Sequence, residues 1–439
     1  MKVKKLTAVA LTAAMALTTA LSGCGGSQSA GSSSSTQEGT KTTENAKNSK
    51  SDSIELTFWT LSTRQGAVEP IVEAFNKEHE NIKVTASFYD TDGMKDACKV
   101  AASSKTLPNM WFNWGGSLGR FYVDNGLTYD LTEYAAENKW SEKFNKNALD
   151  LCTFDGKVSG YPTSYNVMGI YYKKDLFEKC GLEVPTTFEE FEQVCATLKE
   201  NGITPISTGG LYGWHTMRFV ELLIEHYAGA ELHDKMNTFD ESYDNEAVVK
   251  ALEKYKEFCD KGYFPAGFLT QDPNDTLLAL GTGNCAMDIQ GQWQDGRIIQ
   301  NGLDPNDFGV FPFPSGGTDR MSSFAEMTQF NVDNTDEELQ ACMEFVSYYN
   351  SEENAEQYGE YFNMPLPLAN PKMPEGQPNV EGMIKAGEAN GTFTITDQAF
   401  PTEVADVLFD AQEAIANGQM EPAEAAQNIQ KAIEAYNNK

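Results

Sequence analysis

Apolar and polar residues alternate at two spacings in the first third of the folded chain, and their order predicts a sheet of mostly parallel strands. Alternation indicates strands and a repeat near 3.6 residues indicates helices. The predicted elements are strands at 54–59, 82–88 and 107–112 and helices at 68–75 and 94–104. Strand–helix–strand order is typical of α/β folds. Ligands of such sheets bind beyond the carboxyl ends of the strands, which indicates the loops at 60–65 and 113–117.

The later pattern continues the mixed α/β order. Residues 160–172 form a long extended apolar segment, and a helix follows that begins with a capping box of Thr187 and Glu190 and ends at Gly202. A strand is expected at 203–207. Further helices are expected near 217–228, 246–261, 337–350 and 404–416. The folded part is longer than one hydrophobic core usually serves, so two lobes are expected.

The first 24 residues read as an export signal. Lys2, Lys4 and Lys5 precede an uncharged apolar run that is too short to span a bilayer comfortably. The run ends in Leu-Ser-Gly-Cys24, which resembles the lipobox of bacterial lipoproteins. This resemblance implies a signal peptide at 1–23 and a lipid on Cys24. The alternative is an ordinary secretory signal with an incidental cysteine.

Residues 24–52 are mostly small and polar and contain no large apolar side chain. Such a segment cannot bury enough surface to offset its ordering entropy, so a flexible tether is expected. The protein would then be extracytoplasmic, held by lipid alone on the outer face of the bacterial cytoplasmic membrane.

The charge balance excludes some partners. The chain has 33 basic and 64 acidic residues, a formal net charge of −31. Nucleic acid and anionic lipid surfaces both need a basic face, so neither is expected as a partner. Setting Cys24 aside leaves seven cysteines, several of them in apolar patterns, and we expect most of them to be free thiols. Their spacing gives no zinc ligand set, and no metal or cofactor is expected.

Several short phrases, taken in order, resemble the extracellular solute-binding proteins of carbohydrate ABC importers, the group that includes maltose-binding protein. The phrases are LTFWT at 56–60, FNKE at 75–78, IKV at 82–84, PN at 108–109, DGKV at 155–158, GYP at 160–162, YKKDLFEKCGL at 172–182, PTTFEEF at 185–191, GNCAM at 283–287, GQW at 291–293, GVFP at 309–312 and FVSYYNS at 345–351. They cover residues 54–439. Asn109 and Lys173 depart from the residues usual in the family, and Glu326 stands where a glycine-rich run is common.

The resemblance implies a periplasmic-binding-protein-like fold, with two α/β lobes around a ligand cleft. We expect an N-terminal lobe of 54–163 and 313–363 and a C-terminal lobe of 164–312 and 364–439. The chain would cross between them near 163–166, 311–313 and 362–364. The implied partners are a carbohydrate ligand and the membrane permease subunits of an ABC importer, and the protein is expected to be a monomer.

Sugar recognition needs aromatic faces for the rings and paired donors and acceptors for the hydroxyls. Trp114, Trp214 and Trp293 lie in polar, glycine-rich loops and are the stacking candidates, the alternative being loop residues that plug the edge of the core. The other tryptophans, Trp59, Trp111 and Trp140, are expected in the core.

The polar candidates are expected in loops and at the first crossing, with ordinary loop or backbone contacts as the alternative. They are Arg64, Gln65, Asn113, Asn166, Gln290, Gln292, Glu326 and Asn363. Glu326 either binds a hydroxyl or pairs with nearby Arg320.

Catalysis is not expected, because no HExxH or P-loop motif is present. Two other functions stay open. A surface lipoprotein glycosidase needs only a carboxylate pair, and 64 acidic residues leave that possible. A binding protein for a phosphate ester or peptide is disfavoured by the scarcity of arginine, which occurs at five positions.

Overall fold

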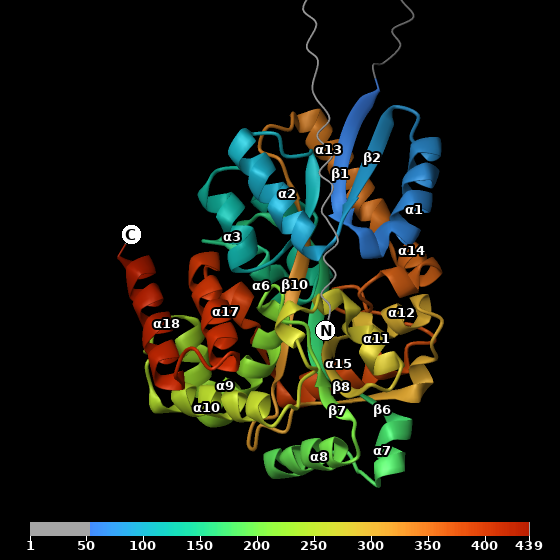
Figure 1. Cartoon of the computed structure of the whole chain (residues 1–439). Coiled ribbons are helices and arrows are strands. Elements are labelled where there is room, and N and C mark those ends of the chain that lie inside the picture. The colour runs from blue at the N-terminus through green and yellow to red at the C-terminus, as the bar shows by residue number, and fades with distance from the viewer. Residues whose placement is uncertain (1–52, 439) are drawn as a thin grey trace, which may run out of the picture. The chain divides into compact units, whose positions relative to one another are not determined.

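A computed structural model describes residues 53–438 (Figure 1). The predicted signal peptide, Cys24 and the tether lie outside the described residues. The main sheet has the strand order β2–β1–β3–β10–β6–β8–β7, with β9 paired to β6 and β11 to β10. The strands are β1 (Ile54–Leu61), β2 (Ile82–Tyr89), β3 (Met110–Trp114), β6 (Gly160–Lys173), β7 (Thr204–Ser207), β8 (Cys285–Gly291), β9 (Phe308–Phe311), β10 (Met321–Phe330) and β11 (Thr392–Thr394). A separate hairpin joins β4 (Thr153–Phe154) to β5 (Lys157–Val158).

Helices cover the sheet along its whole length. They are α1 (Gln65–Glu78), α2 (Thr91–Ser104), α3 (Ser117–Asp124), α4 (Thr132–Glu137), α5 (Trp140–Lys143), α6 (Lys146–Leu151), α7 (Lys174–Cys180), α8 (Phe188–Glu200), α9 (Trp214–Asn237), α10 (Glu246–Asp260), α11 (Thr276–Gly281), α12 (Trp293–Gln300), α13 (Asp336–Tyr349), α14 (Glu352–Gln357), α15 (Pro378–Asn390), α16 (Thr396–Ala399), α17 (Thr402–Ala416) and α18 (Pro422–Asn437). The predicted helices and strands are all present, and the capping box of Thr187 and Glu190 is formed.

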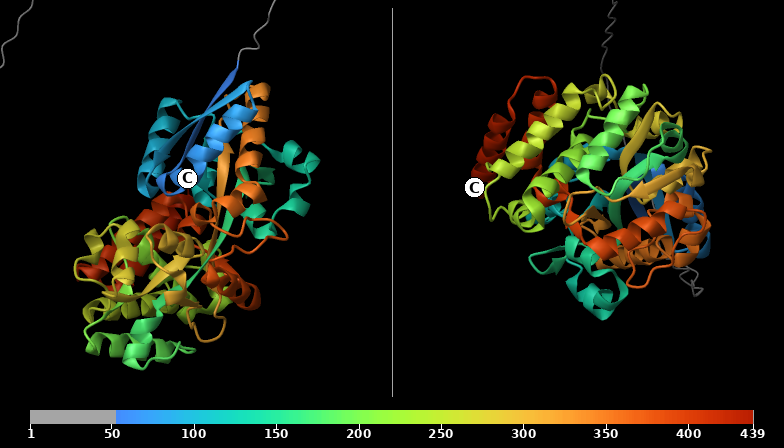
Figure 2. Two further views of the ribbon diagram at one scale, coloured as in Figure 1. Left: turned by 90° about the vertical axis from the view of Figure 1, so that its right-hand side faces the viewer. Right: turned by 90° about the horizontal axis from the view of Figure 1, so that it is seen from below.

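Two large apolar cores define the two lobes. The first lies between β1–β3, α1 and α13, where Phe58, Phe75 and Phe345 meet at ring-centroid distances of 5.2–5.6 Å. Helices α1 and α13 lie side by side there, although they are far apart in sequence (Figure 2). The second core is built by α8, α9, α10, α17 and α18, and Phe219 and Phe258 pack at its centre.

Two long strands carry the chain between the cores (Figure 1). The first half of β6 pairs with β10, and its second half pairs with β8 and β9, so one strand belongs to both lobes. Strand β10 is buried along its whole length and has a bulge at Glu326/Met327. The first three strands are parallel as expected, whereas β10 runs antiparallel to β3 and β6, and β6 runs antiparallel to β8 and β9.

The packing of Phe313 changes one of the predicted lobe boundaries. We expected the chain to return to the first lobe at 311–313, but Phe313 packs against Phe191 and Phe219 in the second core. We therefore propose that residues 313–320 belong to the second lobe and that β10 makes the return. By the same criterion, Met364 and Leu366 pack in the first core, so we propose that the last crossing follows them rather than lying at 362–364.

The burial of Trp111 and Trp140 and the free state of the cysteines agree with the sequence-based expectations. Trp111 and Trp140 are 0% and 2% exposed, and half-buried Trp59 packs against Tyr89. The seven cysteines among residues 53–438 are all free.

Candidate functional site

A cavity of about 980 Å³ opens where the two lobes meet. Its wall comes from the turn after β1, the end of β3, the first turns of α9 and α12, the middle of β10, and the segments 360–363 and 395–398. These segments are distant in sequence, and the two crossing strands bring them together. Seven of the eleven predicted binding residues line this cavity: Arg64, Trp114, Trp214, Gln290, Trp293, Glu326 and Asn363.

The three candidate tryptophans are half-buried and separated by cations. Trp114 ends β3, while Trp214 and Trp293 begin α9 and α12. The ammonium of Lys95 lies 5.2 Å from the ring centroid of Trp114 and 5.7 Å from that of Trp214. The guanidinium of Arg218 lies 4.8 Å from the ring of Trp214 and 5.3 Å from that of Trp293. Cation–π contact holds the rings in place, so the cavity presents aromatic surface that is already oriented.

Gln290 organises the second-lobe wall. Its side-chain oxygen accepts hydrogen bonds from Arg218 Nη1 and Trp293 Nε1, each at 3.1 Å. Its amide nitrogen donates to Thr276 Oγ1 at 3.3 Å and to Asp288 Oδ2 at 3.2 Å. The amide is fully engaged and 2% exposed, so it positions the tryptophan and the arginine.

Glu326 anchors the opposite wall. Its Oε2 atom accepts hydrogen bonds from Arg64 at 2.5 Å, Ser164 at 2.6 Å and Asn363 at 2.9 Å. Burial by itself would lower the pKa of Arg64, but the interactions with Glu326 and Tyr349 together outweigh it and raise that pKa. Glu326 comes from β10, Ser164 from β6 and Arg64 from the first loop, so the group joins the crossing strands to the cavity wall.

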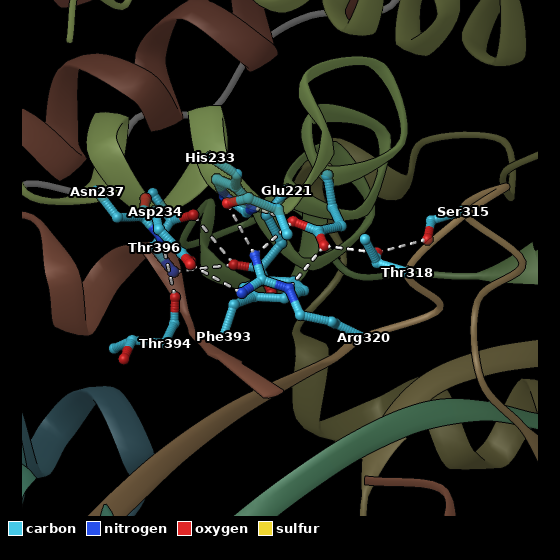
Figure 3. A network of polar contacts seen from close by, with 12 residues as sticks. Glu221, His233, Asp234, Asn237, Ser315, Thr318, Arg320, Phe393, Thr394 and Thr396 are labelled. Carbon is cyan, nitrogen blue, oxygen red and sulfur yellow. Dashed lines mark hydrogen bonds and ion pairs between the residues drawn. The ribbon is translucent and has the colours of Figure 1, made fainter. Parts of the chain in front are cut away.

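The alternative pairing of Glu326 with Arg320 is wrong. The guanidinium of Arg320 donates instead to Glu225 at 2.8 and 2.9 Å and to Asp234 at 3.0 Å (Figure 3). Both partners belong to the α9 helix.

Four predicted residues do not line this cavity. Their side chains are hydrogen-bonded to backbone groups or to neighbouring side chains. Gln65 donates to Glu69 on the exposed face of α1, and Asn113 donates to Gln329 at 2.7 Å and lines only the second hollow described below. Asn166 donates to Ser164 at 2.9 Å. Gln292 accepts from the Val167 amide and donates to the Tyr165 carbonyl, which ties α12 to β6.

Five charged cavity residues were absent from the sequence-based prediction: Lys95, Arg218, Arg297, Glu360 and Asp397. Asp397 lies in α16, and burial raises the pKa of its carboxyl although Lys95 and Arg218 oppose this effect. No pattern in the sequence distinguishes these residues, because each belongs to a helix whose surroundings only the fold determines.

The buried carboxyl of Glu221 binds Thr396, the residue next to Asp397. Glu221 Oε2 accepts hydrogen bonds from the Thr396 amide at 2.9 Å and from its hydroxyl at 3.0 Å. Figure 3 shows Glu221 and Thr396 in the same network of polar contacts as Arg320 and Asp234. Burial raises the pKa of Glu221 to about 8, so this carboxyl is largely protonated at neutral pH.

A second hollow, of about 1680 Å³, continues past Trp114 and Trp214 between α2, α3 and α17. The two spaces share Lys95, Trp114, Trp214 and Asp397 in their walls. The indole nitrogen of Trp214 donates to Asp92 at 3.3 Å, a contact from the second lobe to the first. The cleft is therefore elongated, with Trp114 and Trp214 between its two parts.

Comparison with known proteins identifies the family. Residues 70–428 match the model of the bacterial extracellular solute-binding protein family. The chain belongs to this family. Among curated solute-binding proteins, it is 24% identical over 271 residues to an uncharacterised ABC transporter extracellular-binding protein of Pyrococcus horikoshii, covering 59% of this chain. That match spans only 60% of the relative's own length.

Two further solute-binding proteins match over more of their length. The multiple sugar-binding protein of Streptococcus mutans is 24% identical over 334 residues, which cover 72% of this chain and 76% of the relative. A solved chitin oligosaccharide binding protein superposes with a TM-score of 0.81 at 23% identity, covering 88% of this chain and 100% of that one. The structural likeness establishes the two-lobed α/β fold.

Two features expected of other protein classes are absent from residues 53–438 of this solute-binding protein. No helix in that range is long and apolar enough to cross a membrane. The same residues contain no group of three or more His, Cys, Asp or Glu side chains that could hold a metal ion.

Proposed function

We propose that this solute-binding protein captures a sugar or oligosaccharide in the cleft and delivers it to an ABC importer. The observation that carries the proposal is the set of three half-buried tryptophans, Trp114, Trp214 and Trp293, around a cavity whose walls also hold charged and amide groups. Indole faces pack against the C–H faces of sugar rings, and the polar groups serve the hydroxyls. The names of the sugar-binding relatives support the same ligand class.

The elongated cleft favours more than one sugar ring. One ring would occupy the cavity beside Trp293, and the chain would continue past Trp114 and Trp214 into the second hollow. Closure of the lobes would remove the rings from water, as in other hinged binding proteins. Asp92 and Trp214, already hydrogen-bonded across the cleft, would help to hold the closed form.

The protein is proposed to bind without turnover. Three carboxylates, Glu326, Glu360 and Asp397, lie on the cavity wall, and a glycosidase would need two of them as an acid and a nucleophile or base. Glu326 is instead engaged by three donors, including a guanidinium. Incubation with the tightest-binding saccharide should leave it intact by chromatography, and hydrolysed product would favour the glycosidase.

The ligand class is tested by a thermal-shift screen of the purified protein against mono- and oligosaccharides, sugar phosphates and short peptides. A ligand that binds only the folded state raises the midpoint by an amount set by its concentration over Kd. A rise with at least one saccharide supports the proposal. A rise with peptides or sugar phosphates alone contradicts it.

We further propose a lipid anchor at Cys24, a removed signal peptide at 1–23, and an extracytoplasmic location on the membrane surface as a monomer. Cys24→Ser should release the protein from membranes, because acyl chains on this cysteine would supply the attachment. Cell fractionation measures the release, and a variant as firmly membrane-bound as the parent would contradict the anchor. Ligand affinity should be the same in both proteins.

A further inference from the structure

The distribution of arginine over the chain is uneven. The protein has a formal net charge of −31 and only five arginines, yet Arg64, Arg218 and Arg297 all line the cavity. With Lys95, the cavity wall carries four basic side chains against the three acidic ones of Glu326, Glu360 and Asp397. A wall with a basic excess inside so acidic a protein indicates a ligand that needs the cations.

Two of these arginines have no carboxylate partner. Arg64 is paired with Glu326, and Lys95 lies 3.3 Å from Asp92. Across residues 53–438, neither Arg218 nor Arg297 has a carboxylate oxygen within 4 Å. Buried cations are normally paired, because removing an ion from water is costly.

Arg218 retains unused hydrogen-bonding capacity. It is 7% exposed, and its Nη1 atom donates to the Ile289 carbonyl and to Gln290, both at 3.1 Å. Its Nε atom is buried without a partner. Burial lowers the pKa of Arg218 to about 10, an effect that the more distant Asp288 and Asp397 only partly oppose.

Arg297 lies on the same wall. Its Nη2 atom donates to the Asn274 carbonyl at 3.0 Å, and burial lowers its pKa although the more distant Asp288, Asp272 and Asp275 partly oppose this effect. The charge of Arg297 also lowers the pKa of Arg218, so the two guanidinium groups repel each other. An anion placed against both would relieve this repulsion and supply the missing acceptor.

Two helix ends add to the positive potential. Helices α9 and α12 begin in the cavity wall, at Trp214 and Trp293, and neither has a side-chain cap on its first amides. The N-terminus of a helix carries partial positive charge. Asp295 in the first turn of α12 is turned away, because its carboxylate accepts from Asn379.

We infer that the saccharide is acidic: a uronic acid, alone or within an oligosaccharide, whose carboxylate lies against Arg218 and Arg297 while its ring packs on Trp293. This inference rests on the proposed function and names its substrate class. A planar carboxylate matches the donor fork of a guanidinium, and the pairing is stronger than one between neutral groups.

The test compares matched sugars that differ only at C6. Calorimetric titration of the purified protein uses galacturonate against galactose and glucuronate against glucose, each as monomer and dimer, together with the 6-phosphate of each neutral monomer. At least one uronate should bind tenfold or more tightly than its neutral partner, and the advantage should shrink as salt screens the charges. Neutral sugars binding as tightly would overturn the inference and leave the proposed function standing. Tighter binding of the 6-phosphate would overturn the choice of carboxylate, and binding of none of these sugars would count against both proposals.

Variants locate the effect. Arg297→Gln should abolish the uronate advantage, and Arg297→Lys should restore part of it. Arg120→Gln is the matched control, because Arg120 lies outside the cavity and pairs with Asp155 at 3.1 Å. A thermal unfolding midpoint near the parent's shows that each variant is folded. An advantage that survives in folded Arg297→Gln would contradict the placement of the carboxylate.

Discussion

Two arginines in the second lobe have opposite surroundings. Arg320 gives two hydrogen bonds to Glu225 and one to Asp234, and Glu225 also accepts from His233 and Thr318, each at 2.7 Å (Figure 3). Arg218 meets only a carbonyl, an amide oxygen and two indole faces.

This difference distinguishes an arginine that stabilises the fold from one that can still bind a ligand. A buried charge whose donors are all used within the chain holds elements together and has nothing left to offer a ligand. The Arg320 group ties the loop before β10 to α9, whereas Arg218 keeps capacity where the cavity opens.

The largest change in stability is expected at Glu225, the carboxylate that Arg320 and His233 share. Glu225→Gln would leave Arg320 and His233 without their shared carboxylate, and breaking such a buried pair costs roughly 3–5 kcal/mol. Urea unfolding at pH 7 should show this loss, while saccharide affinity stays at the parent value. Lys372→Gln, at an exposed ion pair with Glu356, is the control and should change stability little.

The pH dependence of the same variant sharpens the test. Burial would raise the pKa of Glu225, but hydrogen bonds from His233 and Arg320 outweigh it and hold the pKa at about 2. A carboxyl with a depressed pKa stabilises the fold above its ordinary pKa, and this contribution is lost as the pH falls toward 2. The gap between parent and Glu225→Gln should therefore narrow below about pH 4.5. A constant gap would contradict the assignment.

The next effect concerns affinity. Trp214→Ala or Trp293→Ala should weaken saccharide binding by roughly tenfold to a thousandfold, from lost area and from about 0.5–1.5 kcal/mol of aromatic contact. Titration by calorimetry measures the change. Tyr227→Ala is a matched control on α9, because Tyr227 is half-buried against Phe188 away from the cavity. Unchanged affinity with a large loss of stability would make the tryptophans core residues.

The residues predicted from the sequence include the tryptophans that line the cavity but not most of its charged residues. Trp114, Trp214 and Trp293 stood out because glycines and polar residues surround them instead of a periodic apolar pattern. Arg218, between Met217 and Phe219 inside a helix, had no such contrast. Asn166 and Gln292 are next to predicted cleft segments in sequence, but both are hydrogen-bonded within the protein. Gln292 binds backbone groups of β6, and Asn166 donates to Ser164.

The fold shows the same division. Elements with clear periodicity were found, as α8 and α13 illustrate, because local spacing determines them. Strand β10 escaped detection since all ten of its residues are buried and no alternation remains. Its partners, β3 and β6, lie more than 150 residues earlier, and only tertiary pairing defines its register.

A smaller change in affinity is expected at Asp397. Asp397→Asn removes the charge near Lys95 and Arg218 and replaces one acceptor oxygen with a donor, and hydrogen bonds to charged groups contribute about 1.5–3 kcal/mol. Affinity for a neutral saccharide should fall by roughly tenfold to a hundredfold. Stability at pH 7 should not fall, because burial already disfavours the ionised carboxyl. A gain in neutral-sugar affinity would show that Asp397 does not bind hydroxyls.

The last prediction concerns the pH dependence of stability at Glu221. Burial raises the pKa of Glu221 from 4.5 to about 8, so the fold favours its protonated form. A group with a raised pKa contributes stability that is complete below its ordinary pKa and is lost as the pH rises to the folded value. Glu221→Gln should therefore flatten the decline in stability between about pH 4.5 and 8, as measured by urea unfolding. An unchanged slope would assign that decline to other groups.

The division between the two arginine environments is tested most directly by measuring the thermal midpoint of three proteins with and without the tightest-binding saccharide. The parent should show a ligand-induced rise. Glu225→Gln should start from a lower midpoint and keep the full rise, whereas Trp293→Ala should start near the parent midpoint and lose most of the rise. The reverse pattern, with the rise lost in Glu225→Gln and kept in Trp293→Ala, would contradict the placement of the saccharide in this cleft.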